Sequence, residues 1–255
     1  MAAEKERLCR DILLINEGGA NNTPIKILFC DMEGTLFSKK IKLPSGGISK
    51  TIWTAIAERL GPSALNEENR TIKRWEKREY TGYLEWMQDT IWIHMKYGLT
   101  KEMFDSLIED IAYYRGVRES FSYLRQSGVK TALLTGGFKQ IADKVQTDLG
   151  IDHAIASCQY FWDRDGNLSG WNLIPCYGVG KALFLRSIMQ DYSLKGIQCA
   201  FIGDSEDDIY SAQEVGLSIA FNGSEMLQKQ CTYAINQPEG GEDFWEILTL
   251  LGLDT

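Results

Sequence analysis

Short apolar runs recur along the chain and predict the strands of a buried sheet. The first run covers residues 25–30, and the others cover residues 130–134, 198–202, 217–221 and 233–235. Runs without polar alternation are typical of strands that are buried on both faces. Segments with helical spacing of apolar residues lie between them, at residues 117–126, 139–149, 181–192 and 208–215. This alternation predicts an α/β fold, a Rossmann-like parallel sheet with helices on both faces.

Two segments depart from the alternation. Residues 4–16 carry Leu8, Ile12 and Ile15 at helical spacing, which predicts an amino-terminal helical extension within residues 1–23. Residues 45–115 have helical patterns and no convincing strand, so we expect a small all-helical cap domain inserted between the first two strands. The core domain would then comprise residues 24–44 and 116–255.

The composition excludes several classes of protein. The chain has 255 residues, a formal charge of −8 and 44% hydrophobic residues, which is enough apolar material for a sizeable core and excludes disorder. An acidic chain is repelled by phosphate backbones, so we expect no nucleic acid partner. Apolar runs fall short of the ~20 residues that span a bilayer, and the first residues lack the apolar core of a signal peptide. We therefore expect no membrane association and a cytoplasmic protein.

Cysteine and histidine offer little chemistry. The six cysteines contain no Cys-x-x-Cys pair, and neither of the two histidines stands at a zinc-ligand spacing. Reduced, structural thiols are the favoured interpretation. Any reaction must then depend on carboxylates, hydroxyls, lysine or a hard metal ion.

Acidic residues follow two of the predicted strands. Asp31 and Glu33 come after the first run, and Asp204 and Asp208 come after the run at 198–202. Ligands of open α/β sheets bind beyond the carboxyl ends of the strands, so these acids should converge. Gathered carboxylates repel one another unless a cation lies between them, and a site without histidine or thiol suits Mg²⁺.

Groups that bind anions occupy neighbouring positions. Thr135, Gly136 and Gly137 follow the run at 130–134, and we expect them to open a helix whose first amides hold an anion. Lys181 stands at the start of another helix and supplies a positive charge. Metal, amides, hydroxyl and ammonium together predict a phosphate site.

These segments resemble the four motifs of the haloacid dehalogenase superfamily. The motifs are Phe-Cys-Asp-Met-Glu-Gly-Thr-Leu at 29–36, Leu-Thr-Gly-Gly-Phe at 134–138, Lys181, and Gly203-Asp204 with Asp208, in that order. The second motif, the turn Asp-Gly-Asn-Leu-Ser-Gly at 165–170 and a helical cap resemble the phosphoserine phosphatase branch. The resemblance covers the chain from about residue 25 to its end.

The resemblance implies a role for each motif residue. Asp31 would be the nucleophile that becomes an aspartyl phosphate, and Glu33 would be the acid and base. Thr135, Gly136 and Lys181 would hold the phosphoryl oxygens. Magnesium would bind to Asp31, the backbone carbonyl of Glu33, Asp204 and, through water, Asp208.

Three positions depart from the family pattern. Glu33 stands where the family usually has aspartate, and Asp207 stands where it usually has asparagine. Phosphoserine-specific members carry a glutamate shortly after the first motif, where this chain has Lys39-Lys40. Phosphoserine itself is therefore not the substrate we expect.

The sequence favours a magnesium-dependent phosphatase that acts on a small phosphorylated metabolite. One alternative is a phosphotransferase that uses the same intermediate. Another is a phosphate-metabolite-binding module in which Glu33 has weakened catalysis. A carbon–halogen dehalogenase is disfavoured because it needs neither the acid at position 33 nor the metal ligand Asp204. A homodimer is an option that the sequence leaves open.

Overall fold

The computed structural model describes residues 12–14, 23–43, 46–49, 51–109 and 111–253. Its contacts divide the chain into two compact units. The first unit falls within Met1–Phe37, Tyr113–Ser157 and Cys176–Thr255, and the second within Ser38–Ala112 and Cys158–Pro175.

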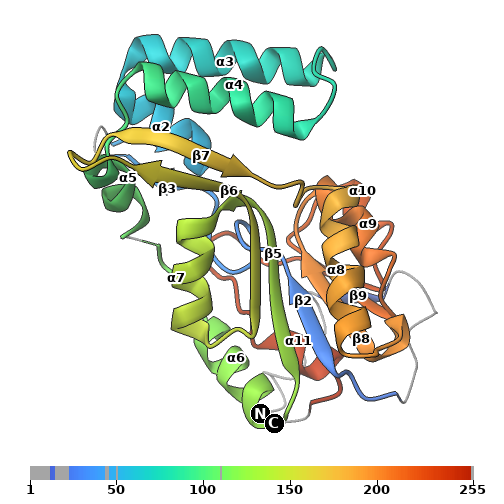
Figure 1. Ribbon diagram of the computed structural model, residues 1–255. Helices are drawn as coiled ribbons and strands as arrows, with labels where there is room; N and C mark the ends of the chain where they lie inside the picture. Colours follow the sequence, from blue (N-terminus) through green and yellow to red (C-terminus); the bar gives the residue numbers. More distant parts are fainter. Residues whose placement is uncertain (1–11, 15–22, 44–45, 50, 110, 254–255) are drawn as a thin grey trace. The chain divides into compact units, whose positions relative to one another are not determined.

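A mostly parallel sheet forms the centre of the first unit (Figure 1). Its parallel strands are β2 (Ile27–Cys30), β5 (Lys130–Phe138), β8 (Cys199–Gly203), β9 (Leu217–Phe221) and β10 (Tyr233–Ile235). Every residue of β2, β8 and β9 is buried, as expected of strands covered on both faces. The predicted parallel sheet is confirmed, and β2 lies between β5 and β8.

The edge of the sheet differs from the sequence-based prediction. The strands run in the order β1-β10-β9-β8-β2-β5-β6-β7, and β1 (Ile12–Leu14) pairs antiparallel with β10. The prediction of a helix over residues 4–16 is therefore wrong at residues 12–14. Its other residues, 4–11 and 15–16, lie outside the described part of the chain. Three consecutive apolar residues here complete a sheet edge, which helical spacing alone does not reveal.

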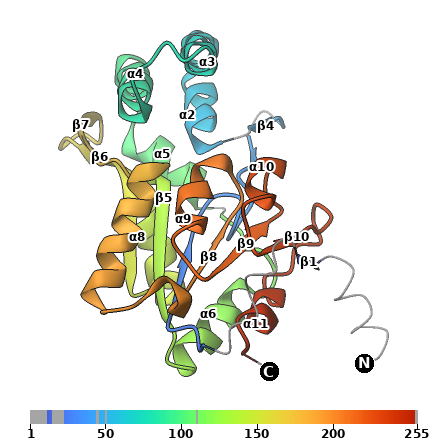
Figure 2. The ribbon, with the colours of Figure 1, turned by 90° about the vertical axis from the view of Figure 1, so that its right-hand side faces the viewer.

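Helices lie on both sides of this sheet. Figure 1 shows α6 and α7 on one side and α8, α9 and α10 on the other, and Figure 2 looks onto the side of α8 and α9. The helical elements of this unit are α6 (Val117–Gln126), α7 (Lys139–Leu149), α8 (Val179–Asp191), η2 (Gly196–Gln198), η3 (Glu206–Asp208), α9 (Ile209–Ala212), α10 (Glu225–Gln228) and α11 (Glu246–Leu250).

The second unit is built mainly from helices with clear start signals. Thr51 caps the first helix by accepting a hydrogen bond from the Thr54 amide (3.1 Å), Pro62 begins the second, and Thr100 caps the fourth. The elements of this unit are β3 (Ile41–Lys42), β4 (Ile48–Ser49), α2 (Ile52–Leu60), α3 (Pro62–Glu76), α4 (Tyr83–Lys96), α5 (Lys101–Ile108), the end of β6 (His153–Trp162) and β7 (Leu168–Leu173).

A hairpin distinguishes this unit from the all-helical domain expected at residues 45–115. The antiparallel strands β6 and β7 flank the predicted turn at Asp165-Gly166. The backbone of this hairpin binds the segment between α4 and α5, through Leu168 N to Leu99 O (3.0 Å) and Lys101 N to Gly166 O (2.8 Å). These hydrogen bonds join segments far apart in the sequence, so helical periodicity could not indicate them.

Two further findings concern the described residues as a whole. None of their helices is long and apolar enough to cross a membrane. Five cysteines in this part of the chain are buried and form no disulfide among the described residues: Cys30, Cys158, Cys176, Cys199 and Cys231.

Candidate active site

The contact between Asp31 and Lys181 joins two elements of the first unit. Asp31 follows the central strand β2, and its amide donates to Ile202 O of β8 (2.9 Å). Lys181 lies in the first turn of α8 with its side chain completely buried. Its Nζ donates to Asp31 Oδ1 (2.9 Å) and to Asp208 Oδ1 (2.6 Å). The fold thus brings together three of the residues that the motifs indicated.

A tight turn after β8 orients Asp208. Its Oδ2 accepts hydrogen bonds from the amides of Asp204 (3.0 Å) and Ser205 (3.1 Å). A side chain on Gly203 would overlap the Asp208 carboxylate, so only glycine allows this close approach. Asp208 therefore both stabilises the start of η3 and contacts Lys181.

Three carboxylates offer ligands for one metal ion. Oxygen atoms of Asp31, Asp204 and Asp208 lie within 4.8 Å of one another, and all three residues are buried. A purely carboxylate set suits a hard divalent cation, and magnesium binds with one or two carboxylates and several waters. The donors thus fit the metal site that the sequence predicted.

Buried charge perturbs the acids of this cluster. Burial raises the pKa of Asp31 to about 6, against the lowering effect of Lys181 and with Asp207 and Asp204 adding to the increase. Burial likewise raises the pKa of Asp208 to about 7, again opposed by Lys181. Burial disfavours the charged form of Lys181, but the charges of Asp207, Asp208 and Asp31 outweigh it and raise its pKa. Lys181 is therefore an ammonium ion.

Glycines place Glu33 and Thr135 close to each other. Gly34 has a φ of +90° and no room for a side chain, because a Cβ there would overlap the Asp204 carboxylate. A Cβ on Gly137 would lie 2.7 Å from Glu33 Oε1 and 3.3 Å from Thr135 Oγ1. The carboxylate of Glu33 and the hydroxyl of Thr135 therefore both lie beside Gly137.

The segment at Gly136 and Gly137 differs from the expected helix start. Both glycines belong to β5, and α7 begins only at Lys139. The Gly137 amide donates to Thr135 Oγ1 (3.0 Å). The expectation that these residues open the helix is thus wrong, because the strand continues to Phe138. Any binding of an anion here would use the end of a strand.

Sequence reasoning left Asp207 without a role. The structure places its Oδ2 2.8 Å from Lys181 Nζ, with the Asp207 side chain 12% exposed. The Ser205 hydroxyl donates to the other oxygen, Oδ1. The unusual aspartate was visible in the sequence, but nothing there showed which of the adjacent acids faces Lys181.

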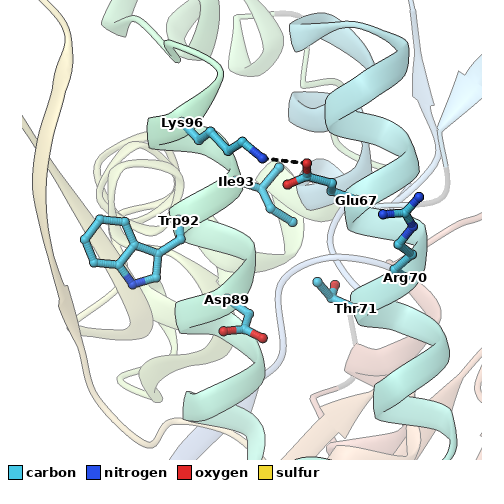
Figure 3. A pocket seen from close by; sticks show the side chains of 7 residues that line it. All are labelled: Glu67, Arg70, Thr71, Asp89, Trp92, Ile93 and Lys96. Atoms are coloured by element: carbon cyan, nitrogen blue, oxygen red, sulfur yellow. Dashed lines mark hydrogen bonds and ion pairs between the residues drawn. The ribbon is translucent and has the colours of Figure 1, made fainter.

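A cavity of about 340 Å³ lies in the second unit between α3 and α4 (Figure 3). Lys96 and Glu67 form an ion pair across it (2.6 Å), and Asp89 pairs with Arg74 (2.7 Å). The lining residues are Glu67, Arg70, Thr71, Asp89, Trp92, Ile93 and Lys96. None of them belongs to the carboxylate cluster.

Comparison with protein families shows the class to which this fold belongs. A family model described as haloacid dehalogenase-like hydrolase matches residues 25–216. The chain belongs to this family, and the resemblance noted in the motifs is confirmed.

Several relatives carry the name phosphoserine phosphatase. The protein from Saccharomyces cerevisiae is 28% identical over 151 residues, which cover 59% of this chain and 47% of the relative. The protein from Archaeoglobus fulgidus is 25% identical over 228 residues, or 88% of this chain and 60% of the relative. The chain thus spans about half of these two curated relatives.

Solved structures share the fold. A substrate-bound phosphoserine phosphatase complex aligns with a TM-score of 0.70 and 20% identity over 89% of this chain and 99% of that one. A haloacid dehalogenase family hydrolase from Salmonella enterica aligns with a TM-score of 0.74 and 16% identity, over 90% of this chain and 72% of the other.

Proposed function

We propose that this chain is a magnesium-dependent phosphatase that hydrolyses a small phosphorylated metabolite through an aspartyl phosphate. The observation that carries the proposal is the buried contact of Lys181 with Asp31 and Asp208. A nucleophilic carboxylate, a fixed ammonium and further acids at the carboxyl ends of strands are what transfer of a phosphoryl group requires. Membership of the haloacid dehalogenase-like hydrolases supports the same reaction class.

Asp31 and Glu33 have different roles in the reaction. A carboxylate oxygen of Asp31 attacks phosphorus while the bond from phosphorus to the leaving oxygen breaks, and Glu33 donates its proton to that oxygen. Water then attacks the phosphorus of the aspartyl phosphate, Glu33 accepts a proton from it, and inorganic phosphate leaves with Asp31 restored. The covalent intermediate divides one difficult hydrolysis into two easier displacements.

Other residues bind the charges of the substrate. Lys181 and Thr135 would contact phosphoryl oxygens, together with the backbone at Gly136. Bound magnesium would supply further positive charge to neutralise the phosphoryl group. Its protein ligands would be Asp31, Asp204, the backbone carbonyl of Glu33 and, through water, Asp208.

Release of phosphate from an aryl phosphate tests the proposal. We expect turnover with magnesium, loss of turnover in EDTA, and a decrease of at least about a thousandfold in Asp31→Asn. Asp191→Asn is a matched control, because it makes the same change at an exposed residue of α8. Full activity in a folded Asp31→Asn protein would refute the nucleophile assignment.

Identification of the substrate requires activity measurements with a panel of sugar phosphates, phosphoamino acids, nucleotides and phospho-alcohols. Phosphoserine belongs in this panel because several relatives are called phosphoserine phosphatases. We expect its turnover to be modest, since Lys39 and Lys40 replace the acidic residue that suits a substrate amine.

A further inference from the structure

Three carboxylates surround the ammonium of Lys181. Three carboxylate oxygens lie within 2.9 Å of Nζ, from Asp31 (2.9 Å), Asp207 (2.8 Å) and Asp208 (2.6 Å). An ammonium has three N–H donors, so these three carboxylate oxygens can accept all of its hydrogen bonds. A phosphoryl oxygen that approaches Lys181 must compete with one of them.

Asp207 differs from the other two acids. Asp31 and Asp208 belong to the set of carboxylates that can hold a metal ion, whereas Asp207 does not. One Asp207 oxygen accepts from Ser205 and the other faces Lys181. In the family pattern this position usually carries asparagine, which has an acceptor oxygen but no charge. Asp207 therefore adds a further negative charge next to the ammonium of Lys181.

This charge lies close to where phosphate would bind. A phosphoryl oxygen at hydrogen-bond distance from Lys181 Nζ would lie within about 6 Å of Asp207 Oδ2, because both oxygens share one nitrogen. At such a separation, with a dielectric constant between those of water and of the protein surface, a like unit charge changes a binding constant by about tenfold.

We propose that Asp207 is a positioning residue that holds Lys181 and weakens the binding of inorganic phosphate, so that the product leaves readily. This inference rests on the proposed function. It predicts that neutralising Asp207 improves the binding of phosphate, whereas damage to the site would impair it.

Titration calorimetry of inorganic phosphate with magnesium present tests this inference. We expect Asp207→Asn to bind phosphate about tenfold more tightly than the natural protein. The inhibition constant of inorganic phosphate, measured during hydrolysis of an aryl phosphate by this variant, should decrease by the same factor. Glu206→Gln is the matched control, because Glu206 is the exposed neighbour in η3, and it should change the affinity less than twofold. Asp207→Ser, also neutral but smaller, should tighten binding in the same direction.

The outcomes separate the two proposals. Unchanged or weaker binding in folded Asp207→Asn and Asp207→Ser, with measurable binding in the natural protein, would overturn the inference alone. Equal tightening by Glu206→Gln would also overturn it, because the effect would then come from net charge. A natural protein that neither binds phosphate nor releases it from any substrate of the panel would refute the proposed function and the inference with it.

Discussion

A buried glutamate in the second unit should make stability depend on pH. Glu68 lies in α3 with 1% of its surface exposed, and its Oε2 has no hydrogen-bond partner among the described residues. Burial raises its pKa from 4.5 to about 7, against a smaller lowering effect of a hydrogen bond with Thr90. The folded protein therefore holds this proton more tightly than the unfolded chain does.

The sign and size of the effect follow from proton linkage. A raised pKa means that the contribution of Glu68 to stability is fully present below about pH 4.5 and is lost as pH rises through about 7. At about 1.4 kcal/mol for each pH unit between these values, the loss is on the order of 3 kcal/mol.

The substitution Glu68→Gln removes this titration and keeps the shape of the side chain. We expect its free energy of unfolding, relative to the natural protein, to increase by roughly 3 kcal/mol from acidic to alkaline pH. Urea unfolding followed by circular dichroism at several pH values between 4 and 9 measures the difference. The contributions of other titrating groups cancel in this difference because both proteins contain them.

The neighbouring residue provides the control. Glu67 is paired with Lys96, and hydrogen bonds from Lys96 and Tyr97 lower its pKa. Glu67→Gln should therefore differ from the natural protein by a constant amount above about pH 6, where this carboxyl is ionised in both states. A difference for Glu68→Gln that stays constant across the same range would refute the reasoning, since it would mean that Glu68 is already ionised when folded.

Two further substitutions test the first unit. Gly34→Ala places a methyl group against the Asp204 carboxylate, at a backbone position with a φ of +90°. Magnesium should therefore bind at least about tenfold more weakly, as measured by calorimetry. Unchanged affinity would contradict the assignment of Asp204 as a metal ligand. Lys181→Met leaves buried acids unpaired and should lower the free energy of unfolding by about 3–5 kcal/mol, with partial recovery in magnesium. A loss below about 1 kcal/mol in urea unfolding would show that Lys181 does not hold these charges together.

Local patterns in the sequence predicted the layers of the first unit and the acids at its strand ends. The apolar run before Asp31 forms a fully buried strand, as its composition indicates. The turn noted at Asp165-Gly166 is also present, between β6 and β7. Such features depend on neighbours in the chain, which is why propensity and spacing reveal them.

Contacts between distant residues decided the rest. Lys181 and Asp31 are 150 residues apart, and only the packing of α8 brings them together. The same packing directs Asp207 at Lys181, although the sequence shows merely a run of acids. Hydrogen bonds with β10 make residues 12–14 a strand, and a hydrogen bond with Leu99 joins the hairpin to the segment between α4 and α5. The sequence by itself determined which groups are available, whereas their pairing depends on distances in space that a local pattern does not contain.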